Sequence, residues 1–326
     1  MSTTQAEPVQ VPEGHRSGFA CFVGRPNAGK STLTNALVGT KIAIASAKPQ
    51  TTRHAIRGIV NRPDAQLVLI DTPGLHRPRT LLGERLNDVV RATWSEVDTV
   101  GVCLPADQKI GPGDTYLVGE LAKLPRVPAL VAVATKSDLV GPTRMASHLM
   151  AIQALEEKLG IIWTHIVPVS SRGWMDSGSA GGDDQLDVLA DTLVSMLPEG
   201  PPLYPGGEVT DEPEETLVAE LIRESVLESV RDELPHSITV AIEEMGLREG
   251  RPAEKPLLDV FASMIVERDS QKGIIIGHRG ERLRDIGEKS RRQIEALLGT
   301  PVYLDLRVKV LKEWQRNPKH LNRLGF

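Results

Sequence analysis

Short apolar runs alternate with amphipathic stretches along residues 18–197. Apolar runs of about four to eight residues are typical of buried strands, and an apolar residue every three or four positions is typical of a helix. The alternation predicts an α/β domain, a mostly parallel sheet with helices on both faces, which binds ligands at the carboxyl ends of its strands. The predicted strands are Gly18–Val23, Ala55–Val60, Gln66–Ile70, Thr99–Leu104, Ala129–Ala134 and Ile166–Val169. The predicted helices are Ser31–Val38, Glu84–Glu96, Asp114–Lys123, Arg144–Leu159 and Leu186–Leu197.

The pattern changes after Pro198–Glu215, a segment with five prolines and three glycines that we interpret as a linker. Beyond it, the predicted order of helix, strand, strand, helix, helix, strand indicates a smaller α+β domain. We therefore predict a disordered extension at residues 1–16, a first domain at 17–197, the linker at 198–215, and a second domain with its tail at 216–326. Ser177–Asp184 is predicted to be a flexible surface loop. The segments of the second domain are Leu217–Val230, Ser237–Glu243, Leu257–Val266, Lys272–Ile276, Glu281–Leu298 and Val302–Val310.

The composition is that of a folded chain. With 326 residues, 40% hydrophobic and 25% charged, two domains are expected and a largely disordered protein is excluded. Apolar runs fall far short of the roughly 20 residues of a membrane helix, and residues 1–14 do not resemble a secretory signal. Cys21 and Cys103 are too few for a disulfide scaffold or a four-ligand zinc site, and both stand in apolar runs. We expect both to be buried, in a protein of the reducing cytoplasm.

The net charge of −5 conceals an asymmetry along the chain. Residues 268–326 hold 14 basic and 7 acidic residues, a net charge of +7, which leaves −12 on the remainder. A basic end on an acidic chain is typical of a surface that binds a polyanion, or of a helix face exposed to water. Charge alone leaves these two interpretations open.

Gly24–Ser31 follows the first predicted strand, precedes the first predicted helix and fits the phosphate-binding pattern Gly-x-x-x-x-Gly-Lys-Ser. Its glycines let backbone N–H groups curl around phosphate oxygens, and the helix N-terminus adds a partial positive charge. Lys30 is expected to reach the β and γ phosphates, and the Ser31 hydroxyl is expected to bind Mg²⁺. The predicted phosphate-loop contacts are Gly24, Arg25, Pro26, Asn27, Ala28, Gly29, Lys30, Ser31 and Thr32.

Two further motifs follow predicted strands. Asp71–Gly74 reads Asp-Thr-Pro-Gly, so Asp71 can hold Mg²⁺ through its water shell and the Gly74 N–H can bond the γ-phosphate. Thr135–Asp138 reads Thr-Lys-Ser-Asp, and an aspartate there selects guanine, because adenine lacks the two donors that its carboxylate would accept. The remaining predicted nucleotide contacts are Asp71, Thr72, Pro73, Gly74, Leu75, Thr135, Lys136, Ser137, Asp138, Ser170 and Ser171.

Gly277–Gly280 reads Gly-His-Arg-Gly and lies between Ile274–Ile276 and the predicted helix Glu281–Leu298. In this order of elements the turn is similar to that of a type II KH domain, in which small residues let about four nucleotides approach by their backbone. A helix corner with a solvated basic face is the alternative. The predicted RNA contacts are Lys272, Ile275, Ile276, Gly277, His278, Arg279, Gly280, Arg282, Arg284 and Lys289, with Arg291 and Arg292 extending the charge.

Several segments together resemble the Era-type family of bacterial ribosome-assembly GTPases, within the translation-factor-related class. They are Gly24–Ser31, Pro49–His54, Asp71–Leu75, Pro198–Pro205 and Leu324–Phe326. The resemblance implies a GTPase domain followed by a type II KH domain, with GTP and Mg²⁺ as ligands and slow hydrolysis to GDP and phosphate. It also implies binding to the 3′ end of 16S rRNA during assembly of the 30S subunit. A cytoplasmic monomer is expected, with no DNA partner and with peripheral contact to the cell membrane.

The resemblance also implies how hydrolysis is organised. Thr52 is expected to be the second Mg²⁺ ligand and γ-phosphate sensor, with Thr51 as the alternative. Leu75 stands where Ras-like enzymes carry a water-orienting glutamine, so the backbone, metal ions, the switch loop or a partner must activate water. Asn27 either holds K⁺ beside the phosphates or only shapes the loop, and His76 is either a general base or a mobile loop residue. The expected catalytic residues are Lys30, Thr52, Asp71 and Gly74.

The sequence departs from the family pattern at the base site. Thr135 replaces an asparagine that reaches guanine and ties the base loop to the phosphate loop, so a lower nucleotide affinity is expected. Ser171 replaces an alanine, with little effect expected, because the backbone N–H makes the contact there. Two other functions are considered: a membrane-associated signalling GTPase that couples growth or the cell cycle to nucleotide state, and a small-molecule kinase. The Gly277–Gly280 turn argues against the first, and Asp138 against the second.

Overall fold

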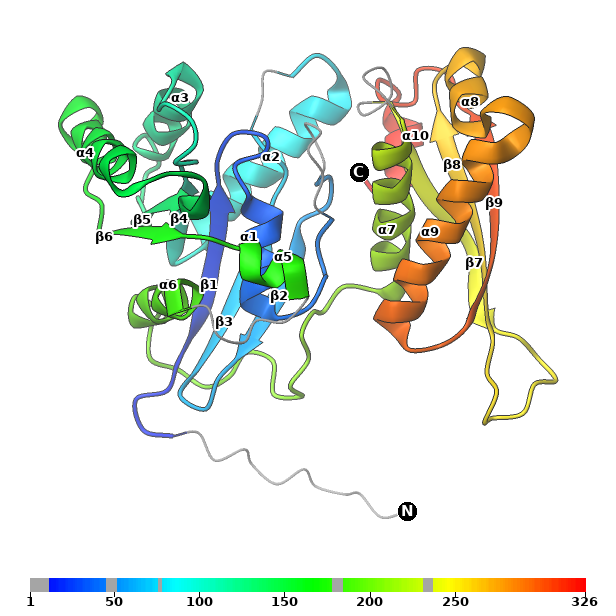
Figure 1. Cartoon of the computed structure of the whole chain (residues 1–326), viewed down its shortest axis with the longest axis horizontal. Helices are drawn as coiled ribbons and strands as arrows, with labels where there is room; N and C mark the ends of the chain where they lie inside the picture. Colours follow the sequence, from blue (N-terminus) through cyan, green and yellow to red (C-terminus); the bar gives the residue numbers. More distant parts are fainter. Residues whose placement is uncertain (1–11, 45–51, 76–77, 178–183, 231–236) are drawn as a thin grey trace.

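The computed structural model describes residues 12–44, 52–75, 78–177, 184–230 and 237–326. These residues form two units that lie side by side, each with its own sheet and covering helices (Figure 1). Most of the predicted N-terminal extension lies outside the described residues, as do Thr51, His76 and nearly all of the predicted flexible loop Ser177–Asp184.

The first unit is built on a six-stranded sheet with strand order β2-β3-β1-β4-β5-β6. Every neighbouring pair is parallel except β2 and β3. All positions of β3 and β4 are buried, as expected for strands covered on both faces. The predicted mostly parallel sheet is thus confirmed. Its strands are β1 (Arg16–Val23), β2 (Ile56–Asn61), β3 (Ala65–Asp71), β4 (Thr99–Cys103), β5 (Ala129–Thr135) and β6 (His165–Val169).

Helices cover both faces of this sheet. On one face α1 and α6 pack through Leu33 and Leu193, and on the other α2, α3 and α4 pack through residues such as Trp94. Cys21 and Cys103 lie on opposite faces and are fully buried, and burial raises the pKa of the Cys103 thiol to about 12. The helices are α1 (Lys30–Val38), α2 (Leu81–Glu96), α3 (Pro112–Leu121), η1 (Ser137–Leu139), α4 (Pro142–Leu159), α5 (Arg172–Ser177) and α6 (Asp184–Ser195).

The helix starts differ from the sequence-based predictions for identifiable reasons. Helix α2 begins at Leu81 rather than at Glu84, because the Thr80 hydroxyl caps it by accepting a hydrogen bond from the Gly83 N–H at 3.2 Å. Helices α3 and α4 begin at Pro112 and Pro142, since proline suits the first helical turn, where its missing N–H is not needed. Two helices of six residues, α5 and α10, are too short to produce a visible apolar period.

The second unit has a three-stranded sheet, β7-β8-β9, in which β7 is antiparallel and β9 parallel to the central strand β8. Helices α7, α8 and α9 cover one face of it (Figure 1). The observed order confirms the predicted smaller α+β domain. None of the described helices combines the length and the apolar character of a membrane-spanning segment. The elements are α7 (Glu214–Ser229), β7 (Thr239–Leu247), β8 (Leu258–Val266), α8 (Asp269–Ile276), η2 (His278–Gly280), α9 (Glu281–Leu298), β9 (Val302–Val310) and α10 (Pro318–Arg323).

The segment between the units is attached to the first sheet over most of its length. At its start, the Ser17 hydroxyl donates to the Pro201 carbonyl at 2.6 Å. In its middle, the Gln66 carboxamide oxygen accepts from the backbone N–H groups of Leu203 and Tyr204. Further along, the Ile59 N–H donates to the Val209 carbonyl, and the Thr210 hydroxyl donates to that of Arg57. This network continues to the residues just before α7.

The same region corrects the expectation for the N-terminal extension. The sequence pattern assigns His15 to a disordered segment, but its side chain is buried and its Nδ1 lies 2.8 Å from the Gly200 carbonyl oxygen. The first strand starts at Arg16, whose guanidinium donates to the Leu197 carbonyl at 2.5 Å. Ordered structure therefore begins before residue 17, because the linker supplies partners for the residues that precede the strand.

Candidate functional site

The loop between β1 and α1 takes the shape that the Gly24–Ser31 motif predicts. Asn27 and Gly29 have positive φ angles of 63° and 92°, so the chain turns tightly before α1 begins at Lys30. Gly24 lies so close to β4 that a Cβ atom there would be 2.8 Å from the Cys103 carbonyl oxygen. A side chain at this position would push the loop out of place, so glycine is required by close backbone approach.

Lys30 reaches into the loop that precedes it. Its Nζ donates to the carbonyl oxygens of Gly24 at 3.1 Å and Arg25 at 3.2 Å. Burial lowers the pKa of this amine, and the Asp71 carboxylate opposes that effect. Gly74 lies on the other side, since a Cβ atom there would be 3.8 Å from Lys30 Nζ. The structure thus brings Lys30 and Gly74 to one place, as a γ-phosphate contact requires.

Three oxygen-bearing side chains converge beside this amine. Asp71 Oδ2 accepts hydrogen bonds from Ser31 Oγ at 2.8 Å and Thr52 Oγ1 at 3.0 Å, and the two hydroxyls are 3.2 Å apart. Asp71 is 0% exposed, and its Oδ1 has no hydrogen-bond partner among the described residues. Burial raises the pKa of Asp71, while the Lys30 charge and the two hydroxyls act in the opposite direction.

The chemistry of this cluster fits Mg²⁺. Hydroxyl and carboxylate oxygens are hard donors, and Mg²⁺ is held by few protein ligands together with water and substrate phosphates. A buried carboxylate with an unused oxygen needs a cation or a proton to offset its desolvation. Ser31, Thr52 and Asp71 could therefore hold the ion, with Asp71 acting through water. That assignment stays a prediction for each of the three residues.

At the base site, a threonine joins the two loops that the family asparagine is expected to join. The Thr135 hydroxyl, buried at the end of β5, donates to the Ala28 carbonyl at 2.8 Å. The side chain is shorter than asparagine but still reaches the phosphate loop. The hydroxyl therefore makes the connection between the loops that the asparagine makes in the family, and a lower nucleotide affinity stays a prediction.

Asp138, the predicted base-recognition residue, is held by two neighbouring side chains. Its Oδ1 accepts from the Ser170 hydroxyl at 2.7 Å, and its Oδ2 lies 3.9 Å from the Arg172 guanidinium. Lys136 adopts a positive φ of 58°, and its amine lies 3.8 Å from an Asp107 carboxylate oxygen. The structure thus places the Thr135–Asp138 motif beside Ser170, as the predicted base pocket requires.

Gln185 is a residue of this site that the motifs did not reveal. Its Oε1 accepts from the Ser137 hydroxyl and from the Ser170 N–H, both at 3.0 Å, and so connects the two loops of the base pocket. Gln185 stands at the start of α6, one residue before the predicted helix start at Leu186. No local pattern identifies such a residue, because its role depends on two loops that only the fold brings together.

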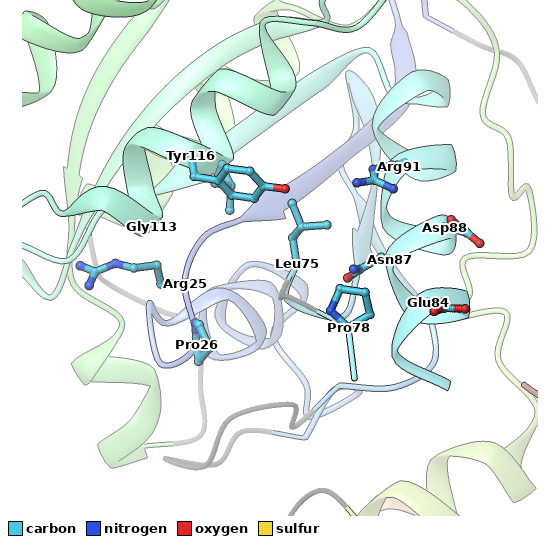
Figure 2. A pocket seen from close by; sticks show the side chains of 11 residues that line it. Arg25, Pro26, Leu75, Pro78, Glu84, Asn87, Asp88, Arg91, Gly113 and Tyr116 are labelled. Carbon is cyan, nitrogen blue, oxygen red and sulfur yellow. The ribbon is translucent and has the colours of Figure 1, made fainter. Parts of the chain in front are cut away.

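Leu75 is one lining residue of a pocket of about 690 Å³ beside the phosphate loop. Figure 2 shows it between side chains of α2, such as Arg91, and of α3, such as Tyr116. Arg25 and Pro26 of the phosphate loop line the same pocket. An aliphatic side chain here packs and cannot orient water, which agrees with the interpretation from the sequence.

In the second unit, the Gly277–Gly280 motif forms the turn between α8 and α9. Gly277, Arg279 and Gly280 have φ angles of 71°, 50° and 81°. A Cβ atom on Gly277 would come within 2.7 Å of Arg282 Cβ, so only glycine fits there, whereas nothing lies within 4 Å of a Cβ on Gly280. The turn is therefore open to solvent at Gly280, where a phosphate could approach.

The side chains around this turn divide into two groups. His278, Arg279 and Arg284 are exposed, and Lys272 and Ile276 are half-buried, so all five remain candidates for RNA contact. One prediction needs correction. Ile275 is 0% exposed and packs in the domain core, so it does not line an open groove. Arg282 donates to the Ile274 carbonyl and Lys289 pairs with Glu228 of α7, and RNA contact by these two residues stays a prediction.

Comparison with known proteins identifies the chain. Residues 19–136 match the family described as "50S ribosome-binding GTPase", and residues 233–315 match the family described as "KH domain". GTPase Era of Streptomyces coelicolor is 64% identical over 323 residues, which cover 99% of both chains. GTPase Era of a Nocardioides species is 65% identical over 312 residues, which cover 96% of both chains. The chain belongs to the Era family of GTPases.

Two solved Era structures share the arrangement of this chain, with a TM-score of 0.85 and coverage of 95% of this chain and 99% of theirs. One is a variant of Aquifex aeolicus Era bound to GDP·AlF4⁻, at 35% identity. The other is Era in complex with MgGDPNP and nucleotides 1506–1542 of 16S rRNA, at 36% identity. The predicted family, and the fold with its GTPase and KH domains, are confirmed.

The geometry of this Era-family member predicts that Asp138→Asn changes base specificity. An amide at this position donates where guanine N1–H and the 2-amino group also donate, so GTP affinity should fall by about a hundredfold or more. Affinity for xanthosine triphosphate, whose base carries an acceptor there, should rise. Competition against a fluorescent GDP measures both. Asp187→Asn on exposed α6 removes the same charge and should bind GTP normally; equal GTP affinity in the two variants would contradict the assignment of Asp138.

Thr135→Ala should separate the two loops that this Era-family member joins through the threonine hydroxyl. The buried Ala28 carbonyl would lose its donor, so GDP and GTP affinities should both fall about five- to tenfold, or roughly 1–1.4 kcal/mol. Equilibrium titration with fluorescent nucleotides measures the change. Thr135→Ser keeps the hydroxyl and should bind within about twofold of wild type, and an alanine variant that binds equally well would show that the hydrogen bond is dispensable.

Proposed function

We propose that this protein is a GTP-driven switch that binds 16S rRNA near its 3′ end through the KH domain and assists maturation of the 30S subunit. The observation that carries the proposal is the agreement along 95% of the chain with an Era structure that contains both MgGDPNP and a 16S rRNA segment. The family description that names the 50S subunit covers only residues 19–136. The RNA-bound relative includes the KH domain as well, and therefore favours the small subunit.

For GTP hydrolysis, each part of the nucleotide site supplies one contribution. Lys30 and the backbone N–H groups of Gly24–Ser31 bind the β and γ phosphates, and the Gly74 N–H bonds the γ-phosphate. Ser31 and Thr52 hold Mg²⁺, with Asp71 acting through water. The ion offsets charge on the phosphate oxygens. Since Leu75 cannot orient water, the attacking water must be held by the backbone, the metal ions, the switch loop or a partner, and we expect slow turnover.

For RNA binding, the Gly277–Gly280 turn receives the backbone of a single strand. The open surface at Gly280 lets phosphates approach, and Arg279 and Arg284 add positive charge on the exposed side. The cytoplasmic location, the monomeric state, the domain limits and the peripheral contact with the cell membrane remain proposals that rest on the family resemblance.

The role of Asn27 can be decided by exchanging monovalent cations. If Asn27, at its φ of 63°, helps hold K⁺ beside the phosphates, the ion offsets charge that develops between the β and γ positions. GTP hydrolysis should then be several-fold faster in KCl than in NaCl at equal ionic strength, measured as phosphate release with Mg²⁺ in excess. Equal rates in the two salts would leave Asn27 with a role in loop shape only.

The RNA site is tested by Gly280→Asp. Tight binding of a short RNA matching the 16S 3′ end is expected with a non-hydrolysable GTP analogue, and weaker binding with GDP. The variant places a negative charge where phosphate approaches, so affinity should fall at least about tenfold, or 1.4 kcal/mol. Fluorescence anisotropy in apo, GDP-bound and analogue-bound protein measures both effects.

Gly299→Asp is a matched control for this variant. Gly299 also has a positive φ, at 66°, and lies at the other end of α9, where a Cβ atom would have nothing within 4 Å of it. The substitution adds the same charge to the same domain and should leave RNA binding like that of wild type. If neither substitution affects RNA binding, the turn is not the RNA site. Binding to anionic vesicles in place of RNA would instead support the membrane-associated alternative.

A further inference from the structure

The switch segment, residues 52–54, precedes β2 and consists of Thr52, Arg53 and His54, whose side chains contact different units. Thr52 Oγ1 lies in the metal cluster of the first unit, 3.0 Å from Asp71 Oδ2. Arg53 is 3% exposed and donates from Nη1 to the Ile238 carbonyl, at the start of the KH sheet, at 2.6 Å. Adjacent residues therefore connect the metal cluster directly to the KH domain.

Arg53 also contacts Trp314, which lies in the segment after β9. Its guanidinium carbon lies 5.6 Å from the centroid of the Trp314 ring, at a distance typical of a cation–π contact. Trp314 is 0% exposed, and its Nε1–H donates to the Ser237 carbonyl at 3.2 Å. Burial and this hydrogen bond hold the indole in place, so it offers Arg53 a fixed ring face.

Phe326 lies beside Trp314 and contacts His54, the residue after Arg53. Its ring stacks on His54, with centroids 4.9 Å apart, and lies 5.9 Å from Trp314. Arg85 of α2 donates to the Phe326 backbone oxygen at 2.5 Å and to Asn322 at 2.7 Å. The tail is therefore held between α2 and the segment that carries Thr52.

The charges around Arg53 make its position specific. In α7, Arg223 donates to both carboxylate oxygens of Glu220, at 2.9 Å and 2.5 Å, and both residues are buried. Burial and the charge of Arg223 disfavour the charged form of Arg53 and lower its pKa, whereas the Glu220 carboxylate, the indole face and the Ile238 carbonyl favour that charge. If Arg53 moved away, its buried charge would lose these partners, and a buried charge without partners is costly.

Chain geometry carries this constraint to the metal site. Neighbouring Cα atoms are only about 3.8 Å apart, so a shift of the Arg53 backbone moves Thr52 with it. A displacement of about 1 Å in a positioning group can reduce the rate of an enzyme about a hundredfold. The position of the Thr52 hydroxyl at the metal site therefore depends on the contact of Arg53 with the KH domain.

We propose that Arg53 is a positioning residue for GTP hydrolysis: its anchorage on Trp314 and the Ile238 carbonyl fixes Thr52 at the metal site, so the KH-domain tail controls the Mg²⁺ requirement and rate of the reaction. This inference rests on the proposed GTPase function and extends it. Hydrolysis depends on a contact between domains, and the tail belongs to the hydrolysis machinery although it does not touch the nucleotide.

The test is a Mg²⁺ titration of GTP hydrolysis by full-length Arg53→Ala. The half-saturating Mg²⁺ concentration should rise about tenfold, and turnover at saturation should fall ten- to hundredfold. GDP affinity should stay within about twofold, because Thr52 acts only when the γ-phosphate is present. A merely structural role would lower nucleotide affinity and turnover together without changing the Mg²⁺ dependence.

Three further variants complete the experiment. Arg57→Ala removes an exposed arginine nearby, which pairs with Asp211 of the linker at 3.2 Å, and should behave like wild type. Arg53→Lys keeps the charge over the indole and should recover most of the turnover. Phe326→Ala removes the ring that stacks on His54 and should raise the half-saturating Mg²⁺ concentration about threefold. This variant tests the positioning role if Arg53→Ala does not fold.

The outcomes separate this inference from the proposed function. Wild-type turnover and nucleotide-dependent RNA binding, measured on the same preparation, test the proposed function. If these hold while the folded Arg53 and Phe326 variants show wild-type Mg²⁺ dependence, the positioning role is refuted and the switch function stands. A raised Mg²⁺ requirement in both variants, with normal GDP affinity, supports the role.

Discussion

The arrangement of the nucleotide site depends on one buried carboxylate. Asp71 gathers hydroxyls from two other segments, Ser31 at the start of α1 and Thr52 in the switch segment. Without water, a lone anion is costly, so each oxygen requires a donor or a cation. The nearby Lys30 amine partly offsets the charge of this carboxylate. The position of the switch segment thus depends on how the charge of Asp71 is compensated. A metal ion bound with phosphate would supply the partner that Asp71 Oδ1 lacks among the described residues.

The motif residues could be placed from the sequence because their spacing is local. Gly24–Ser31, Asp71–Gly74 and Thr135–Asp138 each follow a strand, and the carboxyl ends of parallel strands meet at one edge of a sheet. Residues that act across the fold gave no such pattern. Gln185 connects two loops, and Arg53 contacts Trp314 from a distant part of the chain.

The incorrect assignment of Ile275 at the RNA site has a physical reason too. An apolar residue next to a binding turn can face a groove or the core, and the period of a short helix does not decide between them, as Ile275 shows. Similarly, a basic residue counts as positive charge in the sequence even when a neighbour engages it. Lys289 pairs with Glu228, and Arg292 with Glu288, so these two residues add less to the excess charge than a count of basic residues implies.

The attachment of the linker limits how the two domains can separate. Hydrogen bonds hold it to the first sheet as far as Asp211, and α7 begins at Glu214, which leaves only two residues between the last attachment and the KH domain. A domain on so short a tether cannot diffuse away, and its effective concentration near its docking surface stays high, on the order of millimolar or above. Loss of the Arg53 contact alone would leave the packing of α2 on Trp314 and the bonds of Arg85 to the tail in place, so any release of the tail would be reversible within one molecule. The tail would meet the switch segment again at a rate independent of protein concentration.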